Sequence, residues 1–299
     1  MRGNAPRAAE LAGAAAGPVT SVALLIAGCA LLGVAAAGGG GAVVAIVLAV
    51  VLVAVVFACC DRLALSAMAA RPLGEVEHPE LYRLVRELSK DGRLPVPRLY
   101  LSPAEQPNAF TVGRGPRSAS ICCTEGLLRV LDEAELRGVL GHELAHVSGH
   151  DVAGSSLAAG LASVITFPVS LARFARPGPV DSAGPKGSGL GALEHGLMLV
   201  FGPVAAVIVR LAVSQEREYR ADAAGALLSG DPVALAGALR KIDAGTAEPA
   251  LAPDGRRVSV GHLMIASPFR PEGLARLFRT HPPAGERVRR LEALAGYRR

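Results

Sequence analysis

The chain has 299 residues, of which 51% are apolar, and Lys and Arg outnumber Asp and Glu by 31 to 26. Its mean hydropathy of +0.38 is high for a soluble protein, and the apolar residues are mostly Ala, Val, Leu and Gly, which suits membrane helices. Acidic residues are interleaved with the basic ones and no basic run occurs, so the charge favours an anionic membrane surface over a nucleic-acid partner.

An uncharged N-terminal region is too long for one membrane helix. Residues 11–60 contain no charged side chain, whereas about 20 helical residues cross a hydrocarbon core about 30 Å thick. Four consecutive glycines, 38–41, interrupt the region. We therefore predict a transmembrane hairpin with spans at 18–37 and 42–60. Arginines on both sides of the hairpin place both of its ends in the cytoplasm.

A more polar region with short predicted elements follows the hairpin. Its apolar periodicity predicts a helix at 81–90. Extended segments at 98–101, 108–112 and 118–123 predict a small β-sheet, with a Gly-Arg-Gly-Pro turn between the last two. The five cysteines include two adjacent pairs and none has metal-ligand spacing, so we expect reduced thiols.

The segment at 141–146 reads Gly-His-Glu-Leu-Ala-His and carries the most specific chemistry of the chain. Residues four apart lie on one face of a helix, so the imidazoles of His142 and His146 converge on one ion. Glu143 lies on the same turn, close enough to take a proton from a metal-activated water. Two imidazoles and one further ligand leave a zinc ion an open position, which is typical of catalytic zinc.

The residues around this motif predict a helix. Asp132 is a good N-cap, and Glu135 three residues later completes a capping box. His is scarce, with seven in the whole chain, so a surface helix that carries two histidines by chance is the weaker explanation. Apolar residues recur at helical spacing and give the helix a face to bury: Leu136, Val139, Leu140, Leu144 and Val147.

A second apolar region follows the motif. Residues 152–172 are uncharged and long enough to span a bilayer, and Pro168 is expected to kink the helix. Residues 189–213 contain charged residues near both ends, including Arg210. This segment is either a fourth span, with Arg210 snorkelling to the interface, or a shorter re-entrant element.

The third metal ligand is expected on the helix that starts near residue 214. Glu218 and Asp222 share one face at i and i+4, so one carboxylate binds the metal while the other hydrogen-bonds a ligating imidazole. Glu216 fits less well, because its i+4 partner is Arg220. We therefore predict Glu218 as the ligand and Asp222 as the residue that orients an imidazole.

The two parts of the metal site also constrain the topology. His146 and Glu218 must both lie about 2 Å from the same ion, so the chain between them crosses the membrane an even number of times, two or none. We expect two crossings. Beyond Glu218 the chain is predicted to be helical to about residue 242, and a final helix is predicted at 284–296.

These residues resemble the HtpX family of membrane-embedded zinc metalloproteases, which are related to the CAAX prenyl endopeptidases. The specific part of the resemblance is the combination of His142-Glu143-x-x-His146 with Glu218-x-x-x-Asp222. Three further stretches support it: Pro107-Asn108-Ala109-Phe110, His262-Leu263-Met264-Ile265, and Thr280-His281-Pro282-Pro283 with Glu286-Arg287. The resemblance extends from about Val19 to Leu294.

The resemblance implies a mainly α integral membrane protein with about four transmembrane helices. Its zincin-like α+β catalytic domain would carry the small β-sheet. The expected division has four parts: an N-terminal hairpin (1–60), the first half of the catalytic domain (61–151), a second hairpin (152–213) and the second half of the catalytic domain (214–299).

The implied activity is zinc-dependent hydrolysis of peptide bonds in membrane or misfolded proteins, as part of protein quality control and the stress response. The enzyme would lie in the cytoplasmic membrane with its site facing the cytoplasm. One zinc ion would be held by His142, His146 and Glu218, with Glu143 as the base. The resemblance further implies oxyanion stabilisation by His281 or Arg287, and substrate binding by Arg287 and by the strand that contains Asn108.

Two alternative functions and three alternative ligands stay open at this point. The chain is either a general protease or a site-specific processing enzyme of the prenyl endopeptidase type. It could instead be a non-catalytic membrane scaffold with a structural zinc, although the intact Glu143 argues against this. His150, His195 and His262 are rival ligands; a polar interfacial residue is the better interpretation of the first two, and a structural role that of His262.

Overall fold

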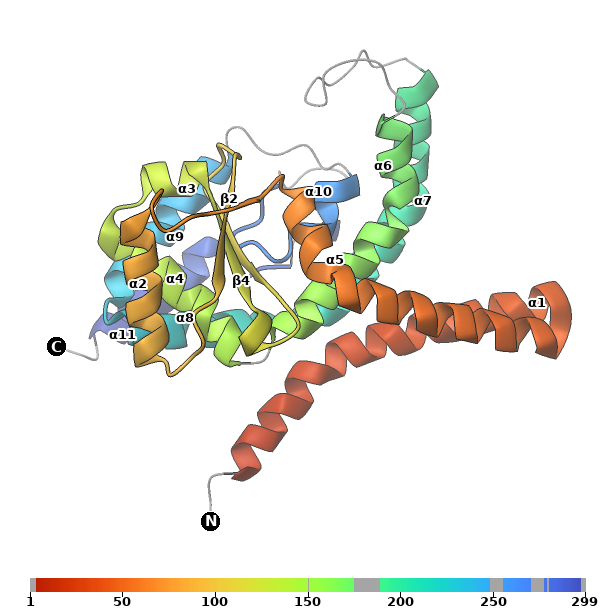
Figure 1. Cartoon of the computed structure of the whole chain (residues 1–299), viewed down its shortest axis with the longest axis horizontal. Helices are drawn as coiled ribbons and strands as arrows, with labels where there is room; N and C mark the ends of the chain where they lie inside the picture. Colours follow the sequence, from red (N-terminus) through yellow and green to blue (C-terminus); the bar gives the residue numbers. More distant parts are fainter. Residues whose placement is uncertain are drawn as a thin grey trace.

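The computed structural model describes residues 4–149, 151–174, 189–247, 255–269, 277–278 and 280–296. The chain is mainly helical, with one small sheet packed among helices and two long apolar helical arms that leave this body (Figure 1). The helices are α1 (Asn4–Ala67), α2 (Pro79–Asp91), α3 (Glu125–Val130), α4 (Glu133–Ser148), α5 (Val152–Ile165), α6 (Phe167–Phe174), α7 (Gly189–Ala212), α8 (Gln215–Ser229), α9 (Pro232–Ala247), α10 (Gly255–Val260) and α11 (Ala284–Gly296). The strands are β1 (Arg71–Pro72), β2 (Arg98–Ser102), β3 (Ala109–Val112) and β4 (Ser120–Thr124), with a 3₁₀ turn η1 (Pro116–Ser118).

The N-terminal helix α1 is a hairpin, as predicted. Ala37 and Gly38 leave the helical region, and the chain reverses there. The positive φ of Gly38, 60°, is open to glycine without steric cost. The two halves of α1 meet at Gly33 and Gly41. A Cβ on Gly33 would lie 2.4 Å from the Gly41 carbonyl oxygen, so no larger residue fits there. Figure 1 shows the two halves side by side.

The second apolar region differs in part from its prediction. The expected span at 152–172 is two helices, because the backbone breaks at Thr166 (φ −87°, ψ 2°), one residue before α6 and close to Pro168. A 14-residue α5 is about 21 Å long, which is too short to cross a bilayer alone. The part of the loop at 175–188 lies outside the described residues.

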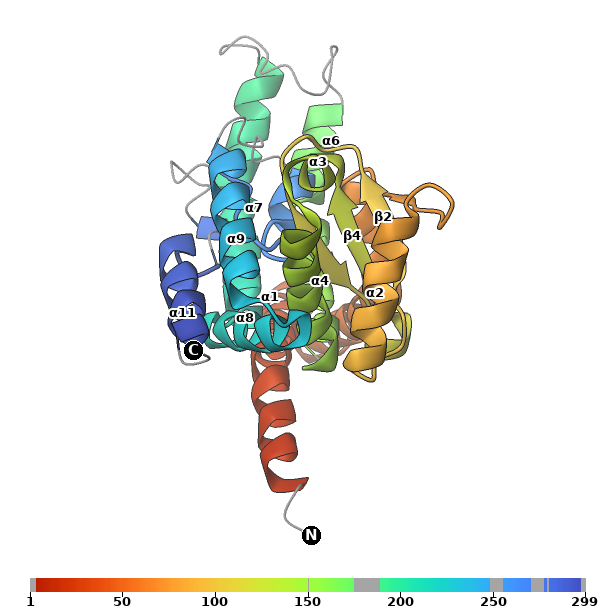
Figure 2. The same ribbon diagram turned by 90° about the vertical axis from the view of Figure 1, so that its left-hand side faces the viewer.

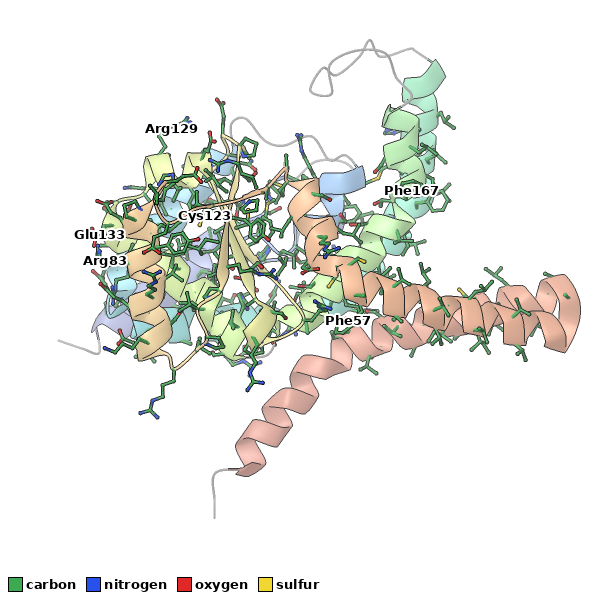
Figure 3. The ribbon with its side chains drawn as sticks, in the orientation of Figure 1. Phe57, Arg83, Cys123, Arg129, Glu133 and Phe167 are labelled. Carbon is green, nitrogen blue, oxygen red and sulfur yellow. The ribbon has the colours of Figure 1, made fainter. Side chains whose placement is uncertain are left out.

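Length and composition make two described helices candidate membrane spans: Gly17–Ala67, which is the hairpin, and His195–Ala212. The expectation of about four spans is therefore supported only in part. Many large apolar side chains on these helices are more than half exposed. Figure 3 shows Phe57 on α1 and Phe167 on the neighbouring α6. The exposed set includes Leu31, Leu32, Val43, Val44 and Val200.

The sheet has the order β1-β2-β4-β3. β2 and β4 are parallel, whereas β1 and β3 are antiparallel to their neighbours. The three longer strands match the predicted segments; β1, with two residues, was not predicted. On the outer edge of β3, Phe110 pairs with Met264 in an antiparallel bridge. The sheet therefore continues into the C-terminal part of the chain.

The main hydrophobic core lies between the sheet and the helices α2, α4 and α9 (Figure 2). It contains Leu84 and Leu88 from α2, Ile121 from β4, Leu140 and Leu144 from α4, and Leu235 and Leu239 from α9. α8 packs directly on α4 at two glycines: a Cβ on Gly225 would lie 2.5 Å from the backbone nitrogen of His142. This close approach brings the predicted third ligand next to the two histidines.

Candidate active site

The helix that carries the histidines begins as the sequence predicts. Asp132 Oδ1 accepts a 2.9 Å hydrogen bond from the Glu135 backbone N–H, and Glu135 Oε2 accepts one of 3.0 Å from the Asp132 N–H. This reciprocal pair is a complete capping box, so two backbone donors of the first turn are satisfied. The predicted start of α4 is confirmed.

Three side chains from α4 and α8 converge on one point. His142 Nε2 and His146 Nε2 lie 3.2 Å apart. Glu218 Oε1 lies 3.7 Å from His146 Nε2, and Glu218 Oε2 lies 4.0 Å from His142 Nε2. Ligand atoms held about 2.0–2.1 Å from a tetrahedral zinc ion are roughly 3.3 Å apart, so this donor set fits such an ion with a small contraction around Glu218.

The second nitrogen of His142 is held by a buried carboxylate. His142 Nδ1 lies 2.9 Å from Asp222 Oδ1, and Arg287 donates to both oxygens of Asp222 at 2.7 and 2.8 Å. Burial alone would raise the pKa of Asp222, but the Arg287 guanidinium outweighs it and lowers the pKa to about 2. A charged carboxylate 2.9 Å from Nδ1 favours the tautomer of His142 that carries its proton there, which leaves the Nε2 lone pair on the side of His146 and Glu218.

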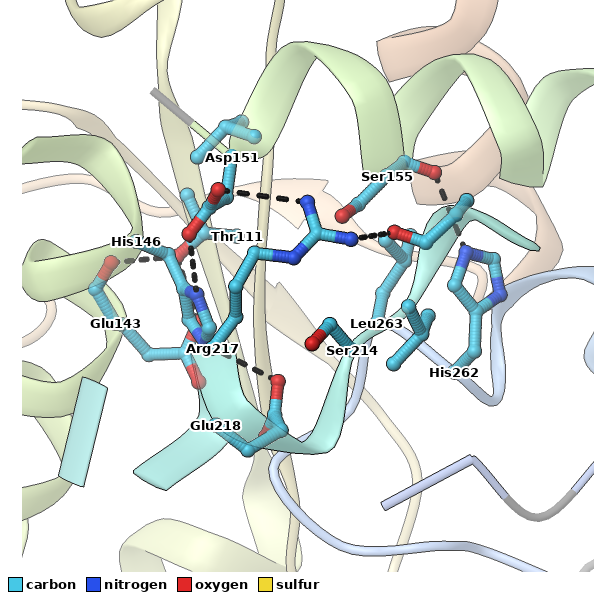
Figure 4. Close-up of a pocket in the computed structure, with 13 residues that line it drawn as sticks. Thr111, Glu143, His146, Asp151, Ser155, Ser214, Arg217, Glu218, His262 and Leu263 are labelled. Atoms are coloured by element: carbon cyan, nitrogen blue, oxygen red, sulfur yellow. Dashed lines mark hydrogen bonds and ion pairs between the residues drawn. The ribbon is translucent and has the colours of Figure 1, made fainter. Parts of the chain in front are cut away.

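Glu143 has one fixed and one available oxygen. Its side chain is buried, and Thr111 on β3 donates a 2.7 Å hydrogen bond to Oε2. Oε1 has no partner among the residues that the structure describes. Thr111, Glu143, His146 and Glu218 line the same pocket (Figure 4). An unpartnered carboxylate oxygen in this pocket is placed to take a proton.

His281 contacts the third candidate ligand. Its Nδ1 donates to Glu218 Oε2 over 3.0 Å, and its buried Nε2 has no partner within the described part of the chain. Burial would raise the pKa of Glu218, but the charge and hydrogen bond of His281 outweigh this and hold the pKa well below its usual range. Glu218 is therefore an anion, as a metal ligand must be.

The comparisons with known proteins agree with this geometry. Residues 75–295 match the sequence profile of Peptidase family M48. The chain belongs to this family. It is 52% identical to "Protease HtpX homolog" of Kineococcus radiotolerans over 243 residues, which cover 79% of this chain and 80% of the relative. Proteins of the same name from Bifidobacterium longum (45%; 79% and 76% covered) and Persephonella marina (40%; 79% and 81% covered) are also similar.

Membership in family M48 makes the chain a metalloprotease, a hydrolase of peptide bonds, and the relatives support its association with membranes. The family implies a metal cofactor, and the buried group of His142, His146 and Glu218 is compatible with one. The predicted resemblance to HtpX proteins is thereby confirmed. The individual roles of the site residues stay predictions.

Asn108, predicted to lie in a substrate-binding strand, binds another part of the chain itself. Its side-chain amide donates to the Ala266 carbonyl over 3.0 Å, and its Oδ1 accepts from the Ala266 N–H over 3.4 Å. Beside it, Ile265 N–H donates to the Ala109 carbonyl over 2.9 Å. Met264 and Ile265 are fully buried, so this segment is a fixed extension of the sheet. Substrate binding by Asn108 stays a prediction, and a substrate would have to compete with Ala266 for the Asn108 side chain.

The structure also places the rival ligands. Glu216 is exposed on α8 and His195 is exposed on α7. His262 is buried and lines the pocket, where its Nε2 donates to the Ser155 carbonyl over 3.2 Å. Burial lowers the pKa of His262 to about 4, so its ring is neutral. None of these three belongs to the group of converging ligand atoms, and His150 lies outside the described residues.

Among the pocket residues that the sequence did not predict, three have side chains near the predicted base and ligands: Thr111, Asp151 and Arg217. Thr111 carries no sequence signal, because any strand residue could stand there. Asp151 lies just beyond the zinc helix motif, five residues after His146, and Arg217 directly precedes Glu218. Closeness in sequence to a predicted metal ligand is the one feature by which Asp151 and Arg217 could have been predicted.

Proposed function

We propose that the chain is a zinc-dependent endopeptidase of the cytoplasmic membrane, which cleaves membrane or misfolded proteins on the cytoplasmic side. One observation carries the proposal: His142, His146 and Glu218 present ligand atoms within 4.8 Å of one another, with the free oxygen of Glu143 in the same pocket. Zinc bound there would act as a Lewis acid that polarises the scissile carbonyl and acidifies the attacking water.

Glu143 acts as general base and then as general acid. Oε2 is engaged by Thr111, so the proton of the attacking water goes to Oε1. The same oxygen then passes the proton to the leaving amine nitrogen. The hydrogen bond from Thr111 keeps the carboxylate from rotating between these two steps. Asp222 and Arg287 contribute by keeping His142 in the tautomer whose Nε2 is free to bind metal.

The oxyanion of the tetrahedral intermediate needs a donor in a region that excludes water. Each guanidinium nitrogen of Arg287 already donates one hydrogen bond, two of them to Asp222 and one to the Ile265 carbonyl over 2.6 Å. His281 Nε2 is buried without a partner in the described chain, and it donates when both ring nitrogens carry a proton, so His281 is the better of the two candidates. We assign the oxyanion role to His281 and an orienting role to Arg287.

The location of the pocket favours membrane proteins as substrates. It is lined by Val152, the first residue of α5, and by Ala212, the last residue of α7. The site therefore lies at the base of the apolar helices, close to the expected lipid interface. Flexible segments of membrane proteins and locally unfolded chains reach such a site, whereas folded globular domains are held away from it.

A processing enzyme of the prenyl endopeptidase type is the second candidate function, because it would use the same catalytic groups. Cleavage of casein by the purified protein, abolished by chelator and restored by zinc, tests the general activity. No cleavage, either before chelation or after zinc is added, would support a scaffold. Quantitative proteomics of cells with the Glu143→Gln variant separates the two enzymes. Accumulation of many unrelated membrane proteins supports quality control; accumulation of one precursor family supports processing.

A further inference from the structure

Two short connections that join the apolar helices to the catalytic helices meet at the pocket. Asp151 lies between the end of α4 at Ser148 and the start of α5 at Val152. Arg217 lies in the first turn of α8, two residues after its start and one before Glu218. Both side chains line the pocket, and in Figure 4 the Arg217 guanidinium lies beside the Asp151 carboxylate.

The contacts of these two residues lead from His146 to the end of α7. Asp151 Oδ2 lies 3.9 Å from His146 Nδ1, and Asp151 Oδ1 lies 3.4 Å from Arg217 Nη1. Arg217 Nη2 also donates to the backbone carbonyl of Ala212, the last residue of α7. The two side chains are only 15% and 8% exposed. Burying such charges is unfavourable unless they are paired, so this pair is a built feature of the site.

The carboxylate and the arginine beside His146 resemble the pair beside His142. His142 has Asp222 at its Nδ1, and Arg287 supports Asp222. His146 points its Nε2 toward His142 and Glu218, so its Nδ1 is the nitrogen left for an orienting partner. Asp151 lies 3.9 Å from that nitrogen, and Arg217 contacts Asp151 through one nitrogen at 3.4 Å, where Arg287 holds both oxygens of Asp222.

We propose that Asp151 and Arg217 form a second carboxylate–arginine pair, which orients His146 for the metal and attaches it to the ends of α5 and α7. The proposal rests on metal binding by His146 in the proposed function. The distance of 3.9 Å between Asp151 and His146 exceeds a hydrogen bond, whereas the Asp222–His142 distance is 2.9 Å. The contribution of Asp151 to metal affinity is therefore smaller than that of Asp222.

The attachment has a consequence for the membrane helices. Asp151 precedes α5 directly, so a shift of α5 moves the carboxylate beside His146. The Ala212 carbonyl ends α7, so a shift of α7 moves Arg217, which contacts that carboxylate. The orientation of one metal ligand thereby depends on how the apolar helices sit. This couples the site to the bilayer through two side chains.

The test uses the full chain in detergent micelles, with zinc affinity measured by chelator competition and ligand geometry by the visible spectrum of the cobalt-substituted protein. Replacing an outer partner of a metal ligand weakens affinity about ten- to a hundredfold. We expect a loss of about tenfold for Asp151→Asn and for Arg217→Gln, with an altered cobalt spectrum. The double variant should lose little more than either single variant, because the two residues act as one unit.

Glu216→Gln is the matched control, because it removes an exposed carboxylate next to Arg217 on the same turn, and it should change neither readout. Arg217→Lys keeps the charge but loses the forked geometry, so it should recover only part of the affinity. Full recovery by lysine would overturn the attachment to Ala212. Affinity within twofold of the parent protein and an unchanged spectrum in Asp151→Asn would overturn the orienting role.

Failure of the proposed function gives a different result. If the parent protein bound no zinc, or if His146→Ala bound it as tightly, the metal assignment itself would be wrong. Thermal unfolding of each metal-free variant separates loss of orientation from loss of fold. If Asp151→Asn unfolds, Arg217→Lys takes its place in the test. The zinc affinity of Arg217→Lys must then fall while its melting temperature stays that of the parent protein.

Discussion

Thr111 donates its hydroxyl to Glu143 Oε2 over 2.7 Å, although the two residues lie 32 positions apart. The bond joins the edge strand of the sheet to the base on the zinc helix. It leaves Glu143 Oε1 without a partner in the described chain. The orientation of the base therefore depends on the sheet, and removing the base should have a different effect from removing the hydroxyl that holds it.

Glu143→Gln should retain the metal and the fold but lose peptide cleavage. The ligands His142, His146 and Glu218 are unchanged, whereas an amide cannot take the proton of the attacking water. Zinc content by atomic absorption and casein turnover, measured on the same preparation, check the prediction. Residual turnover above a few per cent of the parent rate would contradict the role of Glu143.

Thr111→Val should reduce turnover about ten- to a hundredfold with little effect on zinc content. A hydrogen bond to a charged group contributes about 1.5–3 kcal/mol, which corresponds to that range if the bond is needed in the transition state. The expected effect is on kcat, because Thr111 contacts the base and no metal ligand. An unchanged kcat would mean that packing alone keeps the carboxylate in place.

Glu218→Ala should lose both zinc and activity, whereas Glu216→Ala should be nearly silent. Glu218 is buried beside both histidines, and Glu216 is exposed on the same helix two residues earlier. The pair is matched in residue type and in helix position, so general damage to α8 would affect both. Zinc kept by the first variant and lost by the second would exchange the two assignments.

Arg287→Gln should destabilise the protein strongly, by about 3–5 kcal/mol, because it leaves the buried carboxylate of Asp222 without its charge partner. Asp222→Asn also leaves a buried charge, that of Arg287, without its partner, and in addition it should weaken zinc affinity about ten- to a hundredfold. Urea unfolding of the metal-free proteins and chelator competition separate the two effects. Zinc affinity of Asp222→Asn within twofold of the parent protein would show that Asp222 does not help His142 bind metal.

Local patterns in the sequence predicted the zinc helix, its capping box and the final helix well. Asp132 and Glu135 are three residues apart, and the two histidines are four apart, so a single turn of helix decides both geometries. The four-glycine run likewise marked the reversal in α1, since Gly38 alone supplies the positive φ. The pairing of α8 with α4 followed from the missing third ligand of the two histidines and from the helical spacing of Glu218 and Asp222, and the resemblance supported it.

Contacts between distant parts of the chain were the ones missed. Arg287 and Asp222 are 65 positions apart, and the partner of the Asn108 amide lies 158 positions away in a segment without regular structure. No spacing rule connects such residues. The strand β1 has two residues, which is too short for any alternation of side chains to be visible, and it exists because Leu101 and Tyr100 on β2 offer it a paired edge.

The orientation of the apolar helices is the last prediction. The pocket lies where α5 begins and α7 ends, so Ser148 and Glu216, both exposed near those points, should share one side of the membrane. Gly39 directly follows the reversal of α1 at Ala37 and Gly38, so it should lie on the opposite side of the membrane from the arginines at the two ends of the hairpin.

Single cysteines at these three positions, with a fourth at Ser182 in the 175–188 segment outside the described residues, provide the measurement when intact cells are treated with an impermeant thiol reagent. Cysteines at 39 and 182 should react, and those at 148 and 216 should react only after the membrane is permeabilised. The parent chain, whose Cys29 and Cys59 are partly exposed in the hairpin, gives the background. Labelling at 148 or 216 in intact cells would reverse the orientation and place the site outside the cytoplasm. An unreactive cysteine at 182 beside a reactive one at 39 would mean that α5, α6 and α7 enter the bilayer and return to the same side, with no crossing between His146 and Glu218.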